Sequence, residues 1–155
     1  MTAPVEFAEP PPAVLAVRYD LLQFGQLLTR VGGAQRIVLR KPADVDDLWI
    51  WVRSAGGFAI EASRGAWSRT VQIEVGASRP VGPDRELPEL ATQRVGSLVA
   101  AYLTDPSRRA RVFQGASWRA RYLDGPFELT DTSRGADAPV YKHGVRVDVR
   151  MHAHV

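Results

Sequence analysis

The side chains best suited to acid–base or metal chemistry in this chain are its three histidines, two of which stand near the C-terminus. His152 and His154 are two residues apart, so on a strand they share one face, as a pair of metal ligands would. No Asp, Glu or Cys lies beside them in sequence to complete a metal site, and a solvated strand face accounts for the same pair. His143 stands alone. We therefore expect no bound metal.

Other patterns with chemical potential are incomplete. The acidic turn Asp44, Asp46 and Asp47 resembles the start of a calcium loop but lacks the glycine and the distal glutamate of such a loop, so a solvated turn or a helix cap is the simpler interpretation. The Gly-Gly pairs at 32–33 and 56–57 match neither phosphate-loop pattern. Neither G-x-S-x-G nor S-x-x-K occurs. We expect no catalytic residue, no cofactor and no enzymatic activity.

Composition describes an ordinary globular chain. It has 155 residues, 45% hydrophobic and 24% charged, which predicts one domain. The lack of cysteine excludes disulfides and thiol chemistry. A net charge of +3 is too small to indicate sequence-specific DNA binding. No apolar run is long enough to span a membrane, and the N-terminus lacks the features of a secretory signal, so we expect synthesis in the cytosol and no membrane contact.

The spacing of apolar residues predicts the elements that position these groups. Residues 1–11 are expected to form a flexible arm, and 12–155 a single domain. Three- and four-residue apolar steps predict helices over 13–31, ended by Gly32-Gly33, and from Pro88 to Tyr102. Strands are expected over 36–40, 48–53 with 58–60, 67–75, 116–123 and 140–154. The sequence therefore predicts an α+β fold with an antiparallel or mixed sheet of about five strands and two helices packed on one face.

The last of these strands is unusually long. From Gly144 to Val155 apolar and polar residues alternate, as in a strand with one face on a core and one in water. Residues 140–154 would span roughly 50 Å at about 3.3 Å per residue. A small domain has difficulty pairing such a strand, so the surplus is expected to bend or to add to a neighbouring chain. This favours an assembling protein over an enzyme.

Two sets of residues are candidates for contacts with other molecules. Aromatic and apolar strand residues are expected at a subunit interface, although a strand buried on both faces is the alternative: Trp49, Trp51, Val145, Val147 and Val149. Five arginines between Pro106 and Leu123, a stretch without an acid before Asp124, are expected to dock an acidic partner or to face DNA, with a solvated basic loop and strand as the alternative: Arg108, Arg109, Arg111, Arg119 and Arg121.

The arrangement of segments resembles a known family. A helix ending in V-G-G at 31–33 is followed by R-I-V-L-R, by L-W-I-W-V-R-S-A-G-G running into T-V-Q-I-E-V-G-A-S-R, by a helix ending in V-A-A-Y-L, by a Gly-Pro turn at 125–126, and by Y-K-H-G-V-R-V-D-V-R. This order is similar to that of the tail terminator proteins of long-tailed bacteriophages, also called minor tail or tail-completion proteins. The resemblance covers about 12–155 and contains no catalytic signature.

The resemblance implies a structural virion protein of the tail or neck, assembled in the host cytoplasm. Such a protein forms a homohexameric ring that caps the tail tube, stops its polymerisation and joins the head connector, while packaged DNA passes through the ring without sequence-specific binding. Tail channels commonly have acidic linings, so the arginines of this basic chain are expected to face protein partners. Two alternatives stay open: another head–tail connector or neck protein, or a small bacterial α+β ligand-binding domain or enzyme.

Overall fold

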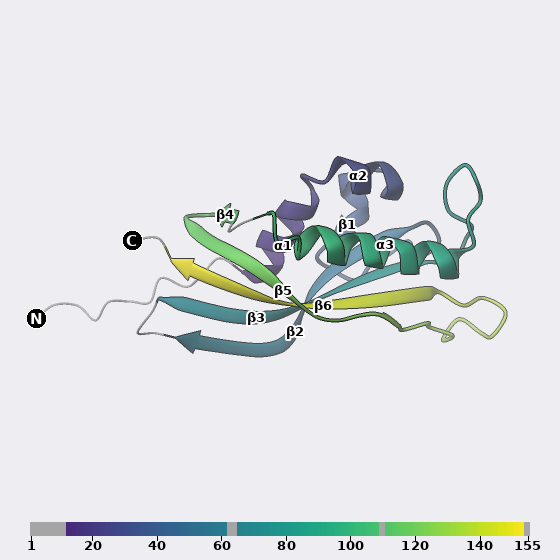
Figure 1. Ribbon diagram of the computed structural model, residues 1–155. Helices are drawn as coiled ribbons and strands as arrows, with labels where there is room; N and C mark the ends of the chain where they lie inside the picture. The colour runs from purple at the N-terminus through teal and green to yellow at the C-terminus, as the bar shows by residue number, and fades with distance from the viewer. Residues whose placement is uncertain (1–11, 62–64, 109–110, 154–155) are drawn as a thin grey trace, which may run out of the picture.

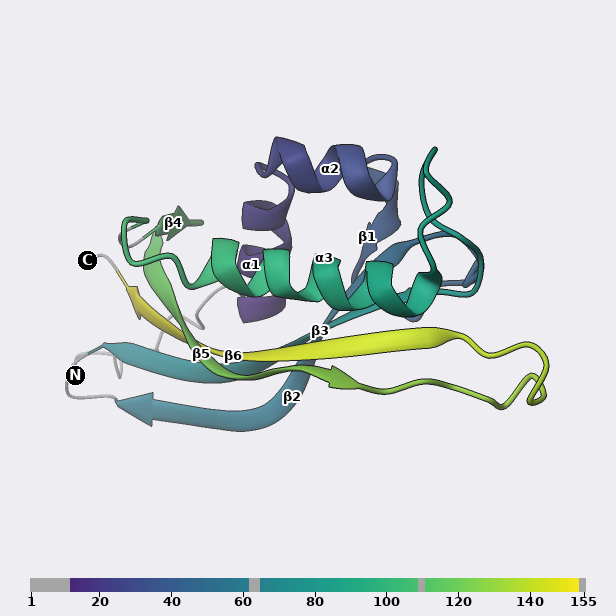
Figure 2. The ribbon, with the colours of Figure 1, turned by 45° about the vertical axis from the view of Figure 1, so that its right-hand side comes forward.

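The helices of this protein pack on one face of a single β-sheet (Figure 1; Figure 2). The computed structural model describes residues 12–61, 65–108 and 111–153, apart from the side chains of 57–61 and 153. Within these ranges the helices are α1 (Ala13–Leu21), α2 (Gly25–Val31), the 3₁₀ helix η1 (Ala34–Arg36) and α3 (Pro88–Leu103). The strands are β1 (Ile37–Val38), β2 (Trp49–Glu61), β3 (Ala66–Ala77), β4 (Arg111–Phe113), β5 (Ala116–Glu128) and β6 (Tyr141–Ala153). The predicted α+β fold is confirmed.

The strands of the described ranges form a mixed sheet in the order β1-β2-β3-β6-β5-β4. β1 runs parallel to β2, and all other neighbours are antiparallel. The sheet has one strand more than the sequence predicts, because three-residue β4 pairs with the start of β5 and is too short to show a period. β5 also continues through Gly125-Pro126, joined by a cis peptide bond, where the sequence predicts a turn.

Strand β6 lies in the middle of this sheet. It pairs with β3 from Tyr141 to His152 and with β5 from His143 to Ala153. Addition of this strand to a neighbouring chain, one of the two outcomes expected for its length, is therefore excluded. The physical reason is that β3 and β5, with 12 and 13 residues, are long enough to cover both edges of the 13-residue β6. The long strands curl together instead (Figure 2).

The first predicted helix is interrupted. α1 ends at Leu21, and the chain turns at Phe24 before α2 begins. The turn places the Phe24 ring in a stack on Tyr102 of α3, with ring centroids 4.0 Å apart. α2 ends as predicted at Gly32, whose φ of 87° is the left-handed conformation that glycine adopts without strain. The interruption thus fastens the N-terminal helices to α3.

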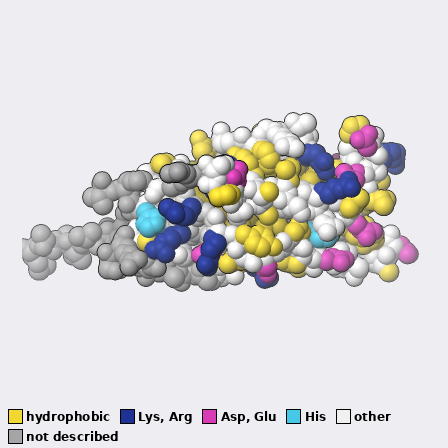
Figure 3. Space-filling view, viewed as in Figure 1, with side chains coloured by type: hydrophobic (Ala, Val, Ile, Leu, Met, Phe, Trp, Pro, Cys, Tyr) yellow, Lys and Arg dark blue, Asp and Glu magenta, His cyan; other side chains and the backbone are white. Residues whose placement is uncertain are grey.

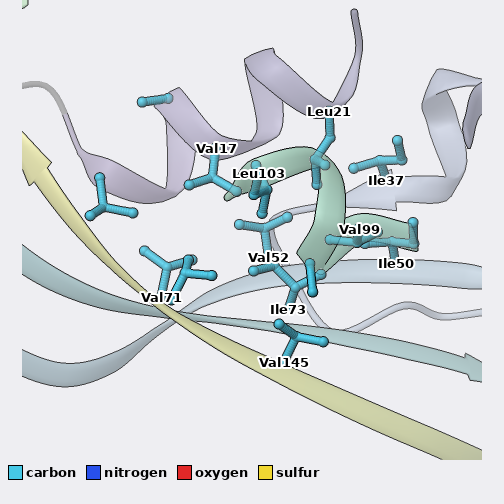
Figure 4. Close-up of a cluster of buried hydrophobic side chains, with 14 of the residues drawn as sticks. Val17, Leu21, Ile37, Ile50, Val52, Val71, Ile73, Val99, Leu103 and Val145 are labelled. Carbon is cyan, nitrogen blue, oxygen red and sulfur yellow. The ribbon is translucent and has the colours of Figure 1, made fainter. Parts of the chain in front are cut away.

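The core lies between the helices and the sheet face that they cover (Figure 4). Figure 4 shows Val17 and Leu21 of α1 and Val99 and Leu103 of α3 facing strand residues such as Ile73. All are at most 1% exposed. Burying one such side chain contributes about 1.5–3 kcal/mol. Gly96 of α3 permits close approach to the sheet, since a Cβ there would lie 3.4 Å from Pro126.

Candidate functional site

The residues considered for metal and acid–base chemistry do not converge. Among the side chains that the structure describes, no three His, Cys, Asp or Glu residues are grouped as a metal site. His152 lies half-buried on β6, and His154 falls outside the described residues. His143 Nδ1 lies 2.8 Å from the Thr92 hydroxyl, and burial lowers the pKa of this histidine. Within the described part of the chain, His152 and His143 thus belong to no group of three potential metal ligands.

The acidic turn is a structural link between loops. The carboxylate of Asp46 accepts hydrogen bonds from the Ser78 hydroxyl at 2.6 Å and from the guanidinium groups of Arg79 and Arg134. These contacts, the Ser78 hydrogen bond foremost, lower the pKa of Asp46. The Asp44 carboxylate accepts a hydrogen bond from the Asp46 backbone N–H and lies 3.5 Å from Arg36. The turn joins three loops, and both carboxylates face cations of the protein itself.

The predicted tryptophan interface is mostly internal. Trp49 is 3% exposed and lies over Gly76, where an added Cβ would come within 2.1 Å of the indole. Its N–H donates to the Val45 carbonyl at 3.3 Å. Trp51 is half-buried beneath the guanidinium of Arg53, 4.4 Å from the ring centroid, and its indole nitrogen has no partner. Both rings line a cavity of about 150 Å³. Trp51 thus keeps some exposure, whereas Trp49 packs within its own subunit.

The three valines predicted at the interface are core residues. Val145, Val147 and Val149 are 0% exposed and belong to the cluster beneath the helices. Contact with another subunit through these side chains is excluded. Their alternation with polar residues correctly predicted a strand with one face on a core and one in water. The apolar face, however, is covered by this chain's own helices, chiefly α3. The predicted subunit contact required β6 to have an unpaired edge, but β6 pairs with β3 on one side and with β5 on the other.

Two of the five predicted docking arginines are internal as well. Arg108 and Arg111 both contact the carboxylate of buried Asp20, and Arg108 stacks 3.5 Å from the Tyr102 ring centroid. They also donate to the last carbonyls of α3, those of Tyr102 and Leu103, at 2.8 and 2.7 Å. Burial lowers the pKa of Arg111, and Asp20 opposes that effect. We call Asp20, Tyr102, Arg108 and Arg111 the Asp20 clasp. Asp20 of α1 neutralises Arg108 and Arg111, so the alternative of a solvated basic loop is wrong for these two residues, and Arg109 falls outside the described residues.

The remaining two arginines are exposed on β5. Arg119 and Arg121 belong to the helix-free face, meaning the strand residues that alternate with the core positions and point away from the helices. Arg121 lies 3.7 Å from Asp148 of β6. Arg119 also lines a cavity of about 610 Å³ at the end of α3, together with Arg108 and Arg111. The structure therefore brings three of the predicted arginines to one hollow.

Sequence reasoning missed three arginines of the helix-free face. Arg53, Arg146 and Arg150 lie on β2 and β6 and share this face with Arg119 and Arg121. The signal was present, since Arg146 and Arg150 alternate with the core valines of β6. It was not used because the predicted docking residues were taken from one continuous stretch of sequence rather than from neighbouring strands.

Neither a protein-family model nor a curated protein matches this chain. Among the described residues, no helix has both the length and the apolar character that a membrane span requires.

Proposed function

We propose that this protein is a ring-forming structural subunit, the tail terminator of a long-tailed bacteriophage. In this role it caps the tail tube, stops its polymerisation and forms the joint to the head connector in the virion. The family resemblance of the sequence gives the identity and the hexameric symmetry. One structural observation gives the strongest support: both sides of the sheet end in long strands that β1 and β4 cover only in part.

The open edges lie on β2 and β5. β1 pairs with β2 only at Ile50 and Trp51, and β4 pairs with β5 only at its first three residues. Among the described residues, no strand pairs with the outer edge of β2 after Trp51. In the same way, no described strand pairs with the outer edge of β5 from Arg119 onward. An open edge presents N–H and C=O groups to any chain that reaches it. The subunit thus offers two different edges on opposite sides.

The strand directions allow these two edges to meet. Strands β2, β3, β6 and β5 alternate in direction, so β5 of a second copy would run antiparallel to β2 with its helices on the same face. Contact between two different surfaces is head-to-tail, and such contacts build a ring where the rotation between copies closes and an open filament where it does not. Tyr122 and Leu123 on β5 are 46% and 40% exposed, which adds apolar area to this contact.

Irregularities limit how tightly the edges can pair. β2 has a register shift between Ser54 and Phe58, and β5 has shifts on both sides of Asp124. Bulges of this kind shorten a continuous ladder and guard against uncontrolled association. Isolated subunits are therefore expected to associate weakly and to close a ring on the tail tube.

Cross-linking tests this proposal directly because the chain contains no cysteine. We expect Ser54→Cys on β2 combined with Leu123→Cys on β5 to give a ladder of covalent oligomers with a short bis-maleimide, ending in one closed species by native mass spectrometry. The measurement is made with and without assembled tail tube. Each single variant serves as the control and should stay monomeric.

Three results would contradict the proposal, each at a different level. A covalent dimer from Leu123→Cys alone would indicate a two-fold contact and refute head-to-tail pairing of the edges. A protein that is monomeric by native mass spectrometry, alone and with tail tube, would refute the ring itself. Loss of the protein from infected cells should produce overlong tails without heads, and normal tails would refute the terminator role.

A further inference from the structure

We propose that the cavity beside Trp49 and Trp51 binds the N-terminal segment of a second copy of this chain, with Phe7 as the anchoring side chain. Residues 1–11 precede the described residues, and their sequence, M-T-A-P-V-E-F-A-E-P-P, matches this cavity in size and in charge. The contact is made by the helix-free face rather than by the edges of β2 and β5, so it goes beyond the proposed ring contact.

The cavity is large enough for one aromatic side chain. It lies at the end of the sheet where β6 begins, between the start of β2 and the loop that joins β5 to β6 (Figure 1). Its volume is about 150 Å³, and its apolar lining consists of Pro42, Val45, Trp49, Trp51 and Val140. A cavity of about this size holds one benzene ring in a protein interior.

Trp51 lacks a hydrogen-bond acceptor. Among the described residues, no acceptor contacts its buried indole N–H, whereas buried polar groups ordinarily have a partner. The indole N–H of Trp49, by contrast, donates to the Val45 carbonyl. A backbone carbonyl of a segment that binds in the cavity would supply the acceptor that Trp51 lacks.

Cations outnumber acids around the cavity. Lys41 and Lys142, the two lysines of this chain, both line it, together with Arg134 and Asp131. Two neighbouring acids are each shared by two cations, Glu74 by Arg53 and Lys142, and Asp46 by Arg79 and Arg134. Among these eight residues, cations therefore exceed acids by two. An acidic occupant would balance this excess, and a basic one would be repelled.

This positive excess belongs to the cavity and not to the whole end of the molecule. Figure 3 shows acidic side chains toward the end where the β5–β6 loop lies. The cavity beside His143 is lined by Glu89 and Glu128 and would repel an acidic segment. At the end of α3, Arg108 and Arg111 line another cavity, but both are already paired with Asp20. An acidic segment is therefore attracted to the lysine-lined cavity in particular.

The N-terminal segment has the matching features. Phe7 is the single aromatic residue among residues 1–11, and Glu6 and Glu9 lie on either side of it in sequence. Residues 1–11 contain no Lys, Arg or His. A phenyl ring between two indoles can pack edge-to-face or offset, as aromatic pairs prefer. The two glutamates equal the excess of two cations around the cavity.

The position of α1 indicates that the occupant comes from a second copy. Phe7 is five residues from Pro12, which directly precedes α1, and five residues span at most about 18 Å. α1 packs on the core side of the sheet, whereas Trp49 and Trp51 alternate with core residues and belong to the helix-free face. Packed layers lie about 10 Å apart, so most of this reach is used by the thickness of the fold before the chain passes around an edge.

Peptide binding tests the match between cavity and segment. The probe is a fluorescent peptide of residues 1–11, and the receptor is the full chain with Phe7→Ala, so that its own segment does not compete. We expect saturable binding by anisotropy. The peptide with Phe7→Ala should bind at least about tenfold more weakly, because a buried aromatic anchor dominates a contact of this kind.

A pair of double variants tests the charges. Lys41→Gln with Lys142→Gln should weaken binding of the peptide about fivefold at low salt, and less at high salt, where exposed charges are screened. The matched control is Arg30→Gln with Arg94→Gln, which removes the same charge from arginines that pair with Glu86 outside this cavity and should leave binding unchanged.

Carbodiimide cross-linking identifies the copy that supplies the segment. This reagent joins a carboxylate directly to an amine, and the lysine amines of this chain are the two at the cavity. Equal amounts of isotope-labelled and unlabelled full chain are mixed, cross-linked and mapped by mass spectrometry. We expect links from Glu6 or Glu9 to Lys41 or Lys142 that join labelled to unlabelled chains. A link between Glu74 and Lys142 of one chain, which lie 3.9 Å apart, is the internal control for the reaction.

Each contrary result has a defined meaning. Equal binding of the wild-type and Phe7→Ala peptides, equal losses in the lysine variant and its control, or no binding up to about 1 mM peptide would overturn the proposal. Links confined to single chains would assign the cavity to the segment of the same chain and refute the second copy. If the lysine variant does not fold, the peptide with Glu6→Gln and Glu9→Gln should show the same loss.

The cysteine cross-link between β2 and β5 separates this contact from the proposed ring. Ring closure by that cross-link without binding of the peptide would refute the cavity contact alone. Binding of the peptide without ring closure would support the cavity contact and refute the edge pairing alone.

Discussion

Changing Asp20 to Asn should destabilise the protein more than any comparable change of an acid at the surface. Asp20 is 6% exposed and contacts both Arg108 and Arg111. Asparagine keeps the shape of the side chain but removes its charge. The two guanidinium groups would then face each other in a largely buried site without a counter-charge. The Asp20 clasp, rather than the helix propensity of α1, is therefore expected to control how firmly α1 is attached.

The size of the effect follows from the burial of the partners. Breaking a buried ion pair by removing one partner costs about 3–5 kcal/mol, because the other charge stays buried and unpaired. The side chain of Arg111 is 12% exposed and that of Arg108 is 25% exposed, so Arg108 can turn partly toward water. We therefore expect a loss at the lower end, about 3 kcal/mol. For a domain of this size, that loss lowers Tm by about 6–12 °C.

Urea unfolding followed by circular dichroism measures this loss. The matched control is Asp148→Asn, whose partner Arg121 is 77% exposed and 3.7 Å away, and a surface pair of this kind contributes about 0–1 kcal/mol. Combining Asp20→Asn with Arg111→Leu should recover part of the stability, since the unpaired charge is then also removed. Equal losses for Asp20→Asn and Asp148→Asn would refute the reasoning that the clasp is buried and coupled.

Two further predictions concern the packing of Trp49 on the helix-free face and the pH dependence of stability. Gly76→Ala should cost about 1–3 kcal/mol and shift tryptophan fluorescence, because its Cβ would overlap the Trp49 indole, whereas Gly25→Ala, with nothing within 4 Å, should be nearly neutral. Burial lowers the pKa of His143 below the ordinary value of a histidine, so its neutral form is favoured in the fold. Its contribution to stability is therefore complete above the pKa of the unfolded chain, about 6.5, and decreases as the pH falls below that value. Thermal melts of His143→Gln should lack this decrease, and an unchanged profile would contradict it.

Periodicity predicted the long elements of this fold because each has one face on the core. Helix α3 and strands β3 and β6 follow their apolar residues closely, and the glycine after Val31 ends α2 as expected. Short elements escaped this reasoning. β4 has three residues and exists because it pairs with β5, and the break before α2 exists because Phe24 stacks on Tyr102. Both depend on contacts between residues far apart in sequence.

Strand length alone did not predict pairing. A long strand was taken to need a partner outside the chain, but β3 and β5 have nearly the same length as β6 and pair along its two edges. The open edges lie instead on β2 and β5, next to the shortest strands of the sheet. Identifying an edge requires the strand order, which follows from the connections between elements rather than from the pattern within any one of them.

The arginine-rich stretch contains two kinds of site, and the neighbouring residues distinguish them. Arg119 and Arg121 alternate with buried Trp118 and half-buried Ala120, so the period of the strand itself sends them to the helix-free face. Arg108 follows the end of α3, where carbonyls without helical partners attract cations, and it turns inward to Asp20. Glutamate in place of Arg108 or Arg111 would therefore change the stability of the fold, because these arginines contact Asp20. Glutamate in place of Arg119 or Arg121 would instead change an exposed surface and so test binding. An assembly phenotype from Arg119 variants that keep the wild-type Tm would locate the functional surface on the sheet.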